Sequence, residues 1–222
     1  MIKGDYLNLT KGQLKSKDGI DLYSRKDFDG MHTAGRVAAE ILDEIVTSVF
    51  PGQTTGKIDS IIEELIRDKN VESGTIGYRG YQHASCISVN HVVCHGIPSD
   101  KILKEGDILN IDVTVIKDGW YGDTSRMYVA GQPSRKAERL IQVTHDALFK
   151  GIDAVKPGKT FGDIGHAIQT YVEANRMSVV RDFCGHGLGR VFHSPPNVLH
   201  YGREGTGPRI EEGMFFTIEP MV

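Results

Sequence analysis

Apolar residues recur at helical spacing in four segments of the chain. The expected helices span residues 24–50, 58–66, 134–155 and 161–175. The first is expected to begin at Ser24, because Asp27 three residues later forms a variant of the capping box, and to end before Pro51. Thr160 and Asp163 have the same spacing at the start of the fourth helix.

From Tyr78 onward, aromatic, β-branched and glycine residues replace the helical pattern. Asp107–Val129 is expected to form a β-hairpin, since Asp118-Gly119 supplies a two-residue turn that accepts positive φ. A last strand is expected over Met214–Val222. The order of helices and strands predicts an α/β protein.

The second half of the chain repeats the first. The pattern V-x-P-G-x-T-x-G-x-I begins at Val49 and again at Val155, a shift of 106 residues. Gly106 matches Gly213 at a shift of 107 residues, and the same shift pairs Asp112 with Glu219. Helices followed by an acidic strand residue therefore occur twice, which indicates a duplicated architecture.

The repeat predicts one domain over residues 24–222, with halves of about 24–130 and 131–222 related by a pseudo-two-fold axis. The acidic strands are expected near that axis, in a central antiparallel sheet with the helices outside. Residues 1–23 are polar, show no sustained period and are expected to form an N-terminal arm.

Composition excludes several classes of protein. The 29 acidic residues outnumber the 26 basic ones, so the net charge of −3 gives no reason to expect nucleic acid as a partner. No stretch is apolar for the length of a membrane span, and the N-terminus lacks the apolar core of a signal peptide. Three cysteines are better interpreted as reduced thiols than as a disulfide framework, which indicates a cytoplasmic protein.

The hairpin brings two carboxylates together. A two-residue turn at Asp118-Gly119 pairs Asp112 with Ser125 and Thr114 with Asp123. Asp112 and Asp123 then become diagonal neighbours on one face, about 7–8 Å apart at the backbone. Two exposed acids on a solvated face are the simpler interpretation. Asp112 lies in an apolar strand, however, and two buried carboxylates repel each other unless a proton or a cation intervenes.

Further metal ligands are expected in the second half. Glu219 repeats Asp112, and His186 lies in a glycine-rich segment that leaves room around its imidazole. Two aspartates, a histidine and a glutamate suit Mn²⁺, Fe²⁺, Co²⁺ or Zn²⁺. Carboxylates that bridge two ions would make a two-metal centre, which activates water and polarises a carbonyl for hydrolysis. His95 and His193 lie in loops as structural histidines or as groups that move protons or hold substrate.

At these residues the chain resembles a known family. The motifs that carry the resemblance are Cys94-His95-Gly96-Ile97-Pro98, Asn110-Ile111-Asp112-Val113-Thr114, Gly122-Asp123-Thr124-Ser125, Gly185-His186-Gly187-Leu188-Gly189 and Thr217-Ile218-Glu219-Pro220-Met221. Together they look like methionine aminopeptidase of the bacterial, type I kind. The match runs from about Ser24 to Val222, in order and with compatible spacing. Between His193 and Glu219 there is no room for the helical insertion of type II enzymes.

The resemblance implies the pita-bread fold and removal of the initiator methionine from nascent proteins and peptides whose second residue is small. It implies two divalent metal ions (Co²⁺, Mn²⁺, Fe²⁺ or Zn²⁺), which activate the attacking water, and ligation by Asp112, Asp123, His186 and Glu219. A cytoplasmic monomer is expected, with the ribosome as a further candidate partner and no role for nucleic acid or membrane.

The resemblance also implies a substrate site. His95 would contact the amide nitrogen of the substrate and His193 its carbonyl oxygen. The methionine pocket would be lined by Tyr78, Tyr81, Cys86 and Phe192. Aromatic faces and a thiol suit a thioether side chain. Thr75 stands where bacterial relatives often have cysteine, a change expected to tune the pocket.

One departure from the family pattern concerns the end of the sequence. The family has a fifth ligand, a second glutamate on a strand after the Glu219 segment, and the sequence ends at Val222. The repeat agrees, because Asp112 is followed by a returning strand that bears Asp123. A chain without the fifth ligand is expected to be impaired in catalysis.

Three alternatives remain open from the sequence. One is a pita-bread protein that binds peptides or nascent chains without turnover. Another is a proline-specific pita-bread aminopeptidase, although those enzymes usually carry a large additional N-terminal domain. A hydrolase that uses Cys94 and His95 is a weaker alternative, because a nucleophile and its base usually come from separate segments.

Overall fold

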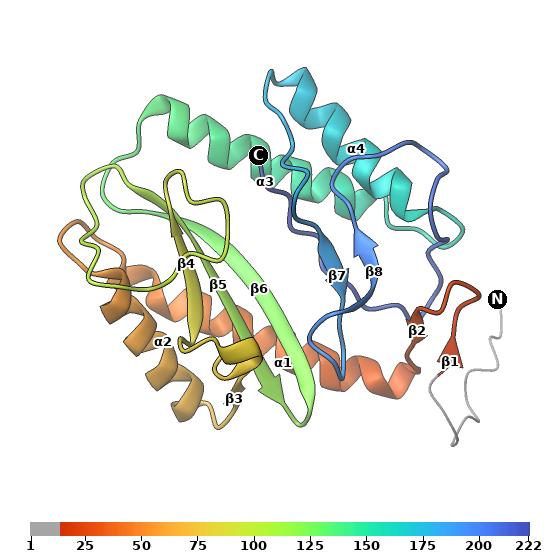
Figure 1. Cartoon of the computed structure of the whole chain (residues 1–222), viewed down its shortest axis with the longest axis horizontal. Coiled ribbons are helices and arrows are strands. Elements are labelled where there is room, and N and C mark those ends of the chain that lie inside the picture. Colours follow the sequence, from red (N-terminus) through yellow and green to blue (C-terminus); the bar gives the residue numbers. More distant parts are fainter. Residues whose placement is uncertain (1–13) are drawn as a thin grey trace. The chain divides into compact units, whose positions relative to one another are not determined.

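The computed structural model describes residues 14–222 (Figure 1). The chain divides into two compact units. One comprises Gly30–Ile141, here the 30–141 unit; the other comprises Gln142–Val222 with the N-terminal residues up to Asp29, here the 142–222 unit. That residues 24–222 form a single domain stays a prediction. Of the expected N-terminal arm, residues 1–13 lie outside the described residues.

The four expected helices are present. They are α1 (Arg25–Glu44), α2 (Thr55–Asp68), α3 (Arg135–Asp153) and α4 (Phe161–Ala174). The backbone N–H and hydroxyl of Ser24 donate to Asp27 at 2.8 and 2.7 Å, and Thr160 makes a full capping box with Asp163. Both predicted caps are confirmed. No helix in the described part of the chain is both long and apolar enough to cross a membrane.

The first helix differs from the expectation at its end. The α-helix stops at Glu44, and the segment Ile45–Ser48 (η2) continues as a 3₁₀ helix before Pro51. The last carbonyl groups of an α-helix have no N–H donor in the helix, and the final turn commonly tightens into 3₁₀ form, which satisfies some of them. The apolar spacing continues through this turn, so periodicity alone did not separate the two forms.

The 30–141 unit contains a four-stranded antiparallel sheet. Its strands are β3 (Glu72–Ser73), β4 (Ser85–Val89), β5 (Ile108–Lys117) and β6 (Trp120–Val129), and a 3₁₀ turn, η3 (Tyr78–Gly80), precedes β4. The β5–β6 register pairs Asp112 with Ser125 and Thr114 with Asp123, which confirms the predicted hairpin. Asp118 and Gly119 both have positive φ, as the two-residue turn requires.

Side-chain alternation in β5 divides the sheet into a core face and a site face. Leu109, Ile111, Val113 and Val115 are fully buried in one cluster with apolar residues of α1 and α2, which cover this face (Figure 1). Asp112 and Thr114 point to the other face because successive side chains of a strand alternate. The core thus fixes which side of the sheet presents the carboxylates.

The 142–222 unit has a second apolar cluster around α4. Its strands are β1 (Leu14–Lys15), β2 (Asp21–Leu22), β7 (Gly185–Gly187) and β8 (Ser194–Val198). Ile164 and Ile168 of α4 are fully buried in this cluster. Ile20 and Leu22 from the β1–β2 hairpin pack into the same cluster.

The predicted repeat appears in the backbone hydrogen bonds of the two units. In the first, Gly52 N–H donates to Leu103 O and Thr54 bridges Ile102. In the second, the equivalent residues do the same: Gly158 N–H donates to Ile210 O, and Thr160 bridges Arg209. Gly106 and Gly213 both have positive φ. The duplication predicted from the sequence is therefore a duplication of local structure.

The predicted strand Met214–Val222 is wrong as a continuous strand. The segment makes one isolated bridge, Phe216 to Gly187, and separate hydrogen bonds such as Thr217 N–H to His186 O. Its partner β7 has only three residues, which are too few to pair with a strand of nine residues. At Glu219 the backbone N–H donates to the side chain of His200 instead of to a strand carbonyl.

Candidate functional site

Asp112 and Asp123 lie on the same face of the β5–β6 hairpin. Each is partly buried, and the register makes them diagonal neighbours. Thr114 lies directly opposite Asp123, and its hydroxyl donates to Asp123 Oδ1 at 3.0 Å. Since Thr114 is itself buried, this hydrogen bond holds one carboxylate in a defined orientation.

Cys86 lies beside these carboxylates. It pairs with Asp112 across the β4–β5 ladder. Burial, with smaller contributions from the negative charges of Asp112 and Asp123, raises the pKa of the Cys86 thiol to about 11. The thiol is therefore protonated and uncharged at neutral pH. The negative charge in this small region of the unit comes from the two aspartates.

Tyr81 completes this side of the site. Its hydroxyl donates to Ser85 O at 2.9 Å. Burial, followed by the contact with Cys86, raises the pKa of Tyr81 above its usual value, so the phenol stays neutral. Tyr81 and Cys86 thus form a neutral wall next to the carboxylate pair.

The other predicted residues of this unit lie in the flanking loops. Tyr78 is half-buried in η3, with the guanidinium of Arg79 over its ring at 5.3 Å. Thr75 is buried and donates to His83 O at 2.8 Å. His95 is exposed and has a left-handed backbone with φ of 55°.

Gly96 fixes the His95 loop against β4. Ile87 N–H donates to Gly96 O at 2.8 Å, and Gly96 N–H donates to Ser88 Oγ at 3.0 Å. A Cβ at Gly96 would lie 2.2 Å from Ile87 O, so only glycine allows this approach. The glycine that follows His95 in the motif is therefore required for the close contact of this loop with β4.

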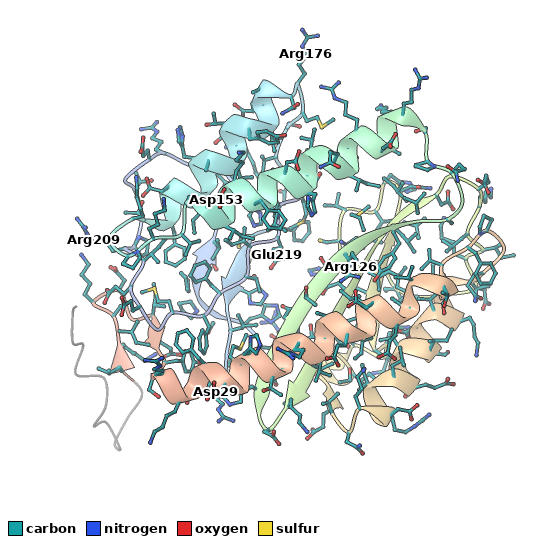
Figure 2. All side chains as sticks on the ribbon, turned by 180° about the vertical axis from the view of Figure 1, so that it is seen from behind. Asp29, Arg126, Asp153, Arg176, Arg209 and Glu219 are labelled. Carbon is teal, nitrogen blue, oxygen red and sulfur yellow. The ribbon has the colours of Figure 1, made fainter. Side chains whose placement is uncertain are left out.

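His186 and Glu219 meet in the 142–222 unit. His186 Nε2 lies 3.7 Å from Glu219 Oε1, and Nδ1 lies 3.1 Å from Gly187 O. When Nδ1 carries the proton and donates to Gly187 O, Nε2 keeps the lone pair that a metal ligand needs. Thr217 links the two residues, because its hydroxyl accepts from His186 N–H at 2.9 Å and donates to Glu219 Oε1 at 2.6 Å. Figure 2 shows Glu219 next to the short strands of this unit.

Glycines let β7 carry His186 between close neighbours. A Cβ at Gly185 would lie 2.4 Å from Thr217 O, and one at Gly187 would lie 2.1 Å from Pro195 O. Larger residues would push β7 away from Thr217 and Pro195 and displace the imidazole. The glycines therefore allow close backbone packing on both sides of His186.

Phe192 and His193 lie close to His186. The ring centroids of His186 and His193 are 4.1 Å apart, and those of Phe192 and His193 are also 4.1 Å apart. Phe192 is buried and meets the His186 ring edge-on at 6.0 Å. Within this unit the structure thus brings together all four predicted residues: His186, Phe192, His193 and Glu219.

His200 is a residue of this site that the sequence reasoning missed. It is fully buried, and its Nε2 accepts from the backbone N–H of Glu219 at 3.1 Å. Burial lowers its pKa to about 4, so the ring is neutral at pH 7. In the sequence His200 follows the apolar pair Val198-Leu199, and nothing local connects it with Glu219.

The donor groups suit divalent metal ions. Carboxylate oxygens and a neutral imidazole are the ligands of Mn²⁺, Fe²⁺, Co²⁺ and Zn²⁺. Each unit supplies two of the four predicted ligands. Among residues 14–222, no group of three or more His, Cys, Asp or Glu side chains is placed to hold a metal ion. The two aspartates crowd negative charge, which a cation would offset.

Comparison with known proteins places the whole of this region in one family. Residues 29–222 match the model of metallopeptidase family M24. A methionine aminopeptidase of Rickettsia prowazekii is 55% identical over 203 residues, which cover 91% of this chain and 78% of that protein.

Solved structures are similar over most of the chain. The crystal structure of the Rickettsia prowazekii methionine aminopeptidase aligns with a TM-score of 0.90 at 55% identity, over 90% of this chain and 81% of that one. A prolidase from Pyrococcus horikoshii aligns with a TM-score of 0.75 at 23% identity, over 90% of this chain and 55% of that one. The latter shares the fold alone. The expected α/β pita-bread fold is confirmed.

Proposed function

Because this chain belongs to metallopeptidase family M24, we propose that it hydrolyses the first peptide bond of polypeptides that begin with methionine and releases that methionine. The observation that carries this proposal is the 55% identity with a methionine aminopeptidase over 91% of the chain. The chain is a metal-dependent hydrolase by family. Its substrates are proposed to be peptides and nascent proteins whose second residue is small.

The proposed metal ligands are Asp112, Asp123, His186 and Glu219, holding two divalent ions of Co²⁺, Mn²⁺, Fe²⁺ or Zn²⁺. Bound ions of this kind activate water for attack and polarise the peptide carbonyl. Two features support the assignment: Asp112 and Asp123 share one sheet face, and His186 Nε2 lies 3.7 Å from Glu219. Thr114 and Thr217 hold Asp123 and Glu219 through their hydroxyls.

Two histidines are proposed to handle the scissile amide. His95 would contact the amide nitrogen, which its exposed position on a loop fixed by Gly96 supports. His193 would donate to the carbonyl oxygen, which its close ring contacts with His186 and Phe192 support. A hydrogen-bond donor aimed at the oxygen stabilises the negative charge that develops there during hydrolysis.

The methionine side chain is proposed to bind among Tyr78, Tyr81, Cys86 and Phe192. Neutral Tyr81 and Cys86 support this, because an uncharged thioether gains most from an uncharged wall. Sulfur also contacts aromatic rings favourably. The pocket therefore selects by shape and polarisability, with no charge to pair.

The cellular setting is proposed from the same function. Removal of an initiator methionine acts on chains as they are made, so we place the protein in the cytoplasm, with nascent chains as substrates and the ribosome as a candidate partner. A single chain supplies all four proposed ligands, which supports action as a monomer.

Two other functions make different predictions. A proline-specific peptidase would cleave Xaa-Pro bonds, but the prolidase likeness, at 23% identity, concerns the fold alone. A protein that only binds peptides would bind a methionine peptide stoichiometrically and release nothing. Neither alternative has a specific observation in its favour among the described residues.

The test is to incubate the chain with Mn²⁺ or Co²⁺ and a Met-Gly peptide and to quantify free methionine. Asp112→Asn and Glu219→Gln should each lower the rate at least 100-fold. Asp100→Asn, which removes an exposed carboxylate from a loop, is the matched control and should leave the rate unchanged. Cleavage of an Xaa-Pro peptide in place of the Met-Gly peptide would refute the proposal. So would the absence of methionine release with any of the metals.

A further inference from the structure

A buried carboxylate on α2 lies outside the proposed metal site. Asp59 is only 6% exposed, although ionised carboxylates are rarely buried without partners. It lies on the side of α2 that faces the sheet, among the buried residues of that helix. None of the proposed steps of the reaction uses it, so its burial needs another reason.

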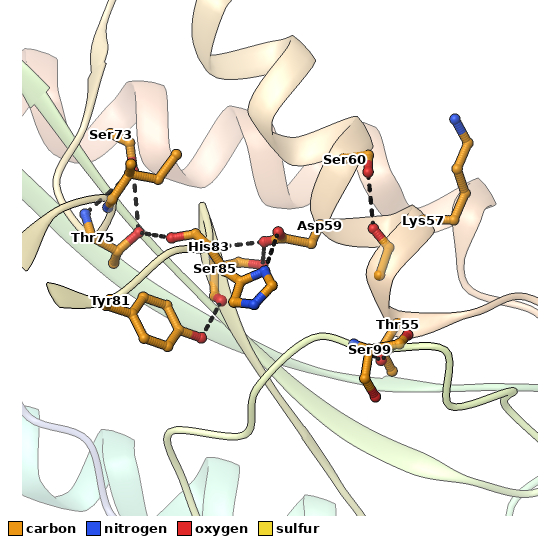
Figure 3. A network of polar contacts seen from close by, with 12 residues as sticks. Thr55, Lys57, Asp59, Ser60, Ser73, Thr75, Tyr81, His83, Ser85 and Ser99 are labelled. Atoms are coloured by element: carbon orange, nitrogen blue, oxygen red, sulfur yellow. Dashed lines mark hydrogen bonds and ion pairs between the residues drawn. The ribbon is translucent and has the colours of Figure 1, made fainter.

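Asp59 makes three contacts, all with the segment that leads into β4 (Figure 3). Its Oδ1 accepts from the backbone N–H of Ser85 at 2.9 Å and from the Ser85 hydroxyl at 2.7 Å. Its Oδ2 lies 3.2 Å from His83 Nδ1. Hydrogen bonds to a charged acceptor are about twice as strong as neutral ones. Asp59 therefore anchors the start of β4 to α2 at two residues, His83 and Ser85.

The segment from His83 to Ser85, which Asp59 holds, also positions the proposed pocket. Ser85 O accepts the Tyr81 hydroxyl at 2.9 Å, and His83 O accepts the Thr75 hydroxyl at 2.8 Å. Cys86 follows Ser85 directly and, by strand alternation, points to the opposite face. Displacement of Ser85 would therefore move Tyr81 and Cys86 together.

The same three side chains do not form a nucleophilic triad. Ser85 is fully buried, so its hydroxyl cannot reach a substrate. Its Oγ bonds to Asp59, and the His83 ring bonds to the same carboxylate, whereas a triad needs the imidazole between serine and acid. The three residues therefore form a structural hydrogen-bond network and not a catalytic site.

We propose that Asp59 is a positioning residue that sets the substrate pocket, by holding Ser85 and His83 so that Tyr81 and Cys86 form a fixed wall for the methionine side chain. This inference rests on the proposed function. A fixed wall fits the unbranched methionine side chain closely and excludes branched ones. Discrimination by one methylene in such a pocket is about 10–200-fold and depends on close fit.

The test compares Asp59→Ala with the unchanged chain on Met-Gly and Leu-Gly peptides in the presence of Mn²⁺. The measured quantity is the ratio of kcat/KM for the two substrates in one sample. Because both values share one enzyme concentration, the ratio does not depend on the folded or metal-loaded fraction. We expect the ratio to fall about tenfold in Asp59→Ala, through a raised KM for Met-Gly with kcat within about threefold.

Two further variants keep the test decisive if Asp59→Ala is poorly folded. Asp59→Asn keeps an oxygen acceptor for Ser85 and should keep most of the ratio. Ser85→Ala removes only the 2.7 Å hydroxyl bond and should lower the ratio a few fold. Glu63→Ala, an exposed position on the same helix, is the matched control and should not change it.

The outcomes separate the inference from the proposed function. Methionine release by the unchanged chain, with equal Met/Leu ratios in the unchanged chain, Asp59→Ala and Ser85→Ala, overturns the inference alone. An equal fall of activity on both substrates in Asp59→Ala and Ser85→Ala would show a purely structural role and also overturns it. Absence of methionine release by the unchanged chain overturns both.

Discussion

The imidazole Nε2 of His200 accepts a hydrogen bond from the backbone N–H of Glu219, with the two nitrogens 3.1 Å apart. His200 is fully buried and neutral at pH 7 because burial lowers its pKa to about 4. The ring therefore replaces a strand carbonyl as the acceptor for Glu219, and it holds the backbone that carries a proposed metal ligand.

Replacing His200 should weaken metal binding. His200→Phe keeps an aromatic ring but removes the acceptor, so Glu219 loses its backbone partner. Loss of such an outer partner typically costs 10–100-fold in metal affinity or activity, and we expect a loss in that range. Titration of Mn²⁺ by calorimetry measures it. His200→Gln, which retains an acceptor, should recover part of the affinity; equal affinity of the Phe variant and the unchanged chain would contradict the prediction.

Thr114 should tune the site through Asp123. Thr114→Val is nearly isosteric and removes the 3.0 Å hydrogen bond to Asp123 Oδ1, so the carboxylate loses its orientation. We expect about a tenfold loss of methionine release, with Thr114→Ser retaining most of the activity. The rate of release from a Met-Gly peptide at fixed Mn²⁺ is the measurement. An active Val variant would show that the register of the hairpin alone orients Asp123.

Two glycines near α1 should respond to alanine in opposite directions. At Gly122 of β6 a Cβ would lie 2.2 Å from Ala34 O, so Gly122→Ala should destabilise the fold by about 1–3 kcal/mol. At Gly35, inside α1, a Cβ would meet nothing within 4 Å. Gly35→Ala should stabilise it by about 0.5–1 kcal/mol, because glycine is a poor helix residue. Urea unfolding of the two variants measures the difference, and a stable Gly122→Ala variant would be inconsistent with the close approach of β6 to α1.

Asp163 should make the stability of the chain depend on acidic pH. The backbone N–H of Thr160, followed by its hydroxyl, holds the pKa of Asp163 below its usual value. As pH falls below the ordinary value of about 4, the unfolded chain binds more protons than the folded chain, so this stabilisation is lost. Asp163→Asn should cost about 1 kcal/mol at pH 7 and show a shallower loss of stability toward pH 3. Thermal unfolding at the two pH values measures both, and parallel profiles of the two proteins would count against the prediction.

The parts of the fold that were predicted correctly depend on short-range rules. The helix caps at Ser24 and Thr160 follow from residues three positions apart. The register that places Asp112 near Asp123 follows from a two-residue turn, since each later pair is then fixed in order. The repeat was visible because glycines with positive φ must recur where the backbone recurs.

The predictions that failed depend on a distant partner. Met214–Val222 has the apolar pattern of a strand, but whether it pairs is decided by the three-residue length of β7 and by His200. The end of α1 differs for another, local reason, because over the single turn Ile45–Ser48 the spacing of apolar residues does not distinguish an α-helix from a 3₁₀ helix.

The sequence by itself determined the helices, the hairpin and its register, and the identity of the residues that resemble the ligands of a known family. Tertiary structure alone revealed the residues that hold them: Asp59 bonds to Ser85 across 26 positions, and His200 to Glu219 across 19. A buried polar group is stable only where its partner is, and that partner is chosen by packing between elements. For this reason the chemistry of the site could be predicted from its motifs, whereas the contacts that orient it required the fold.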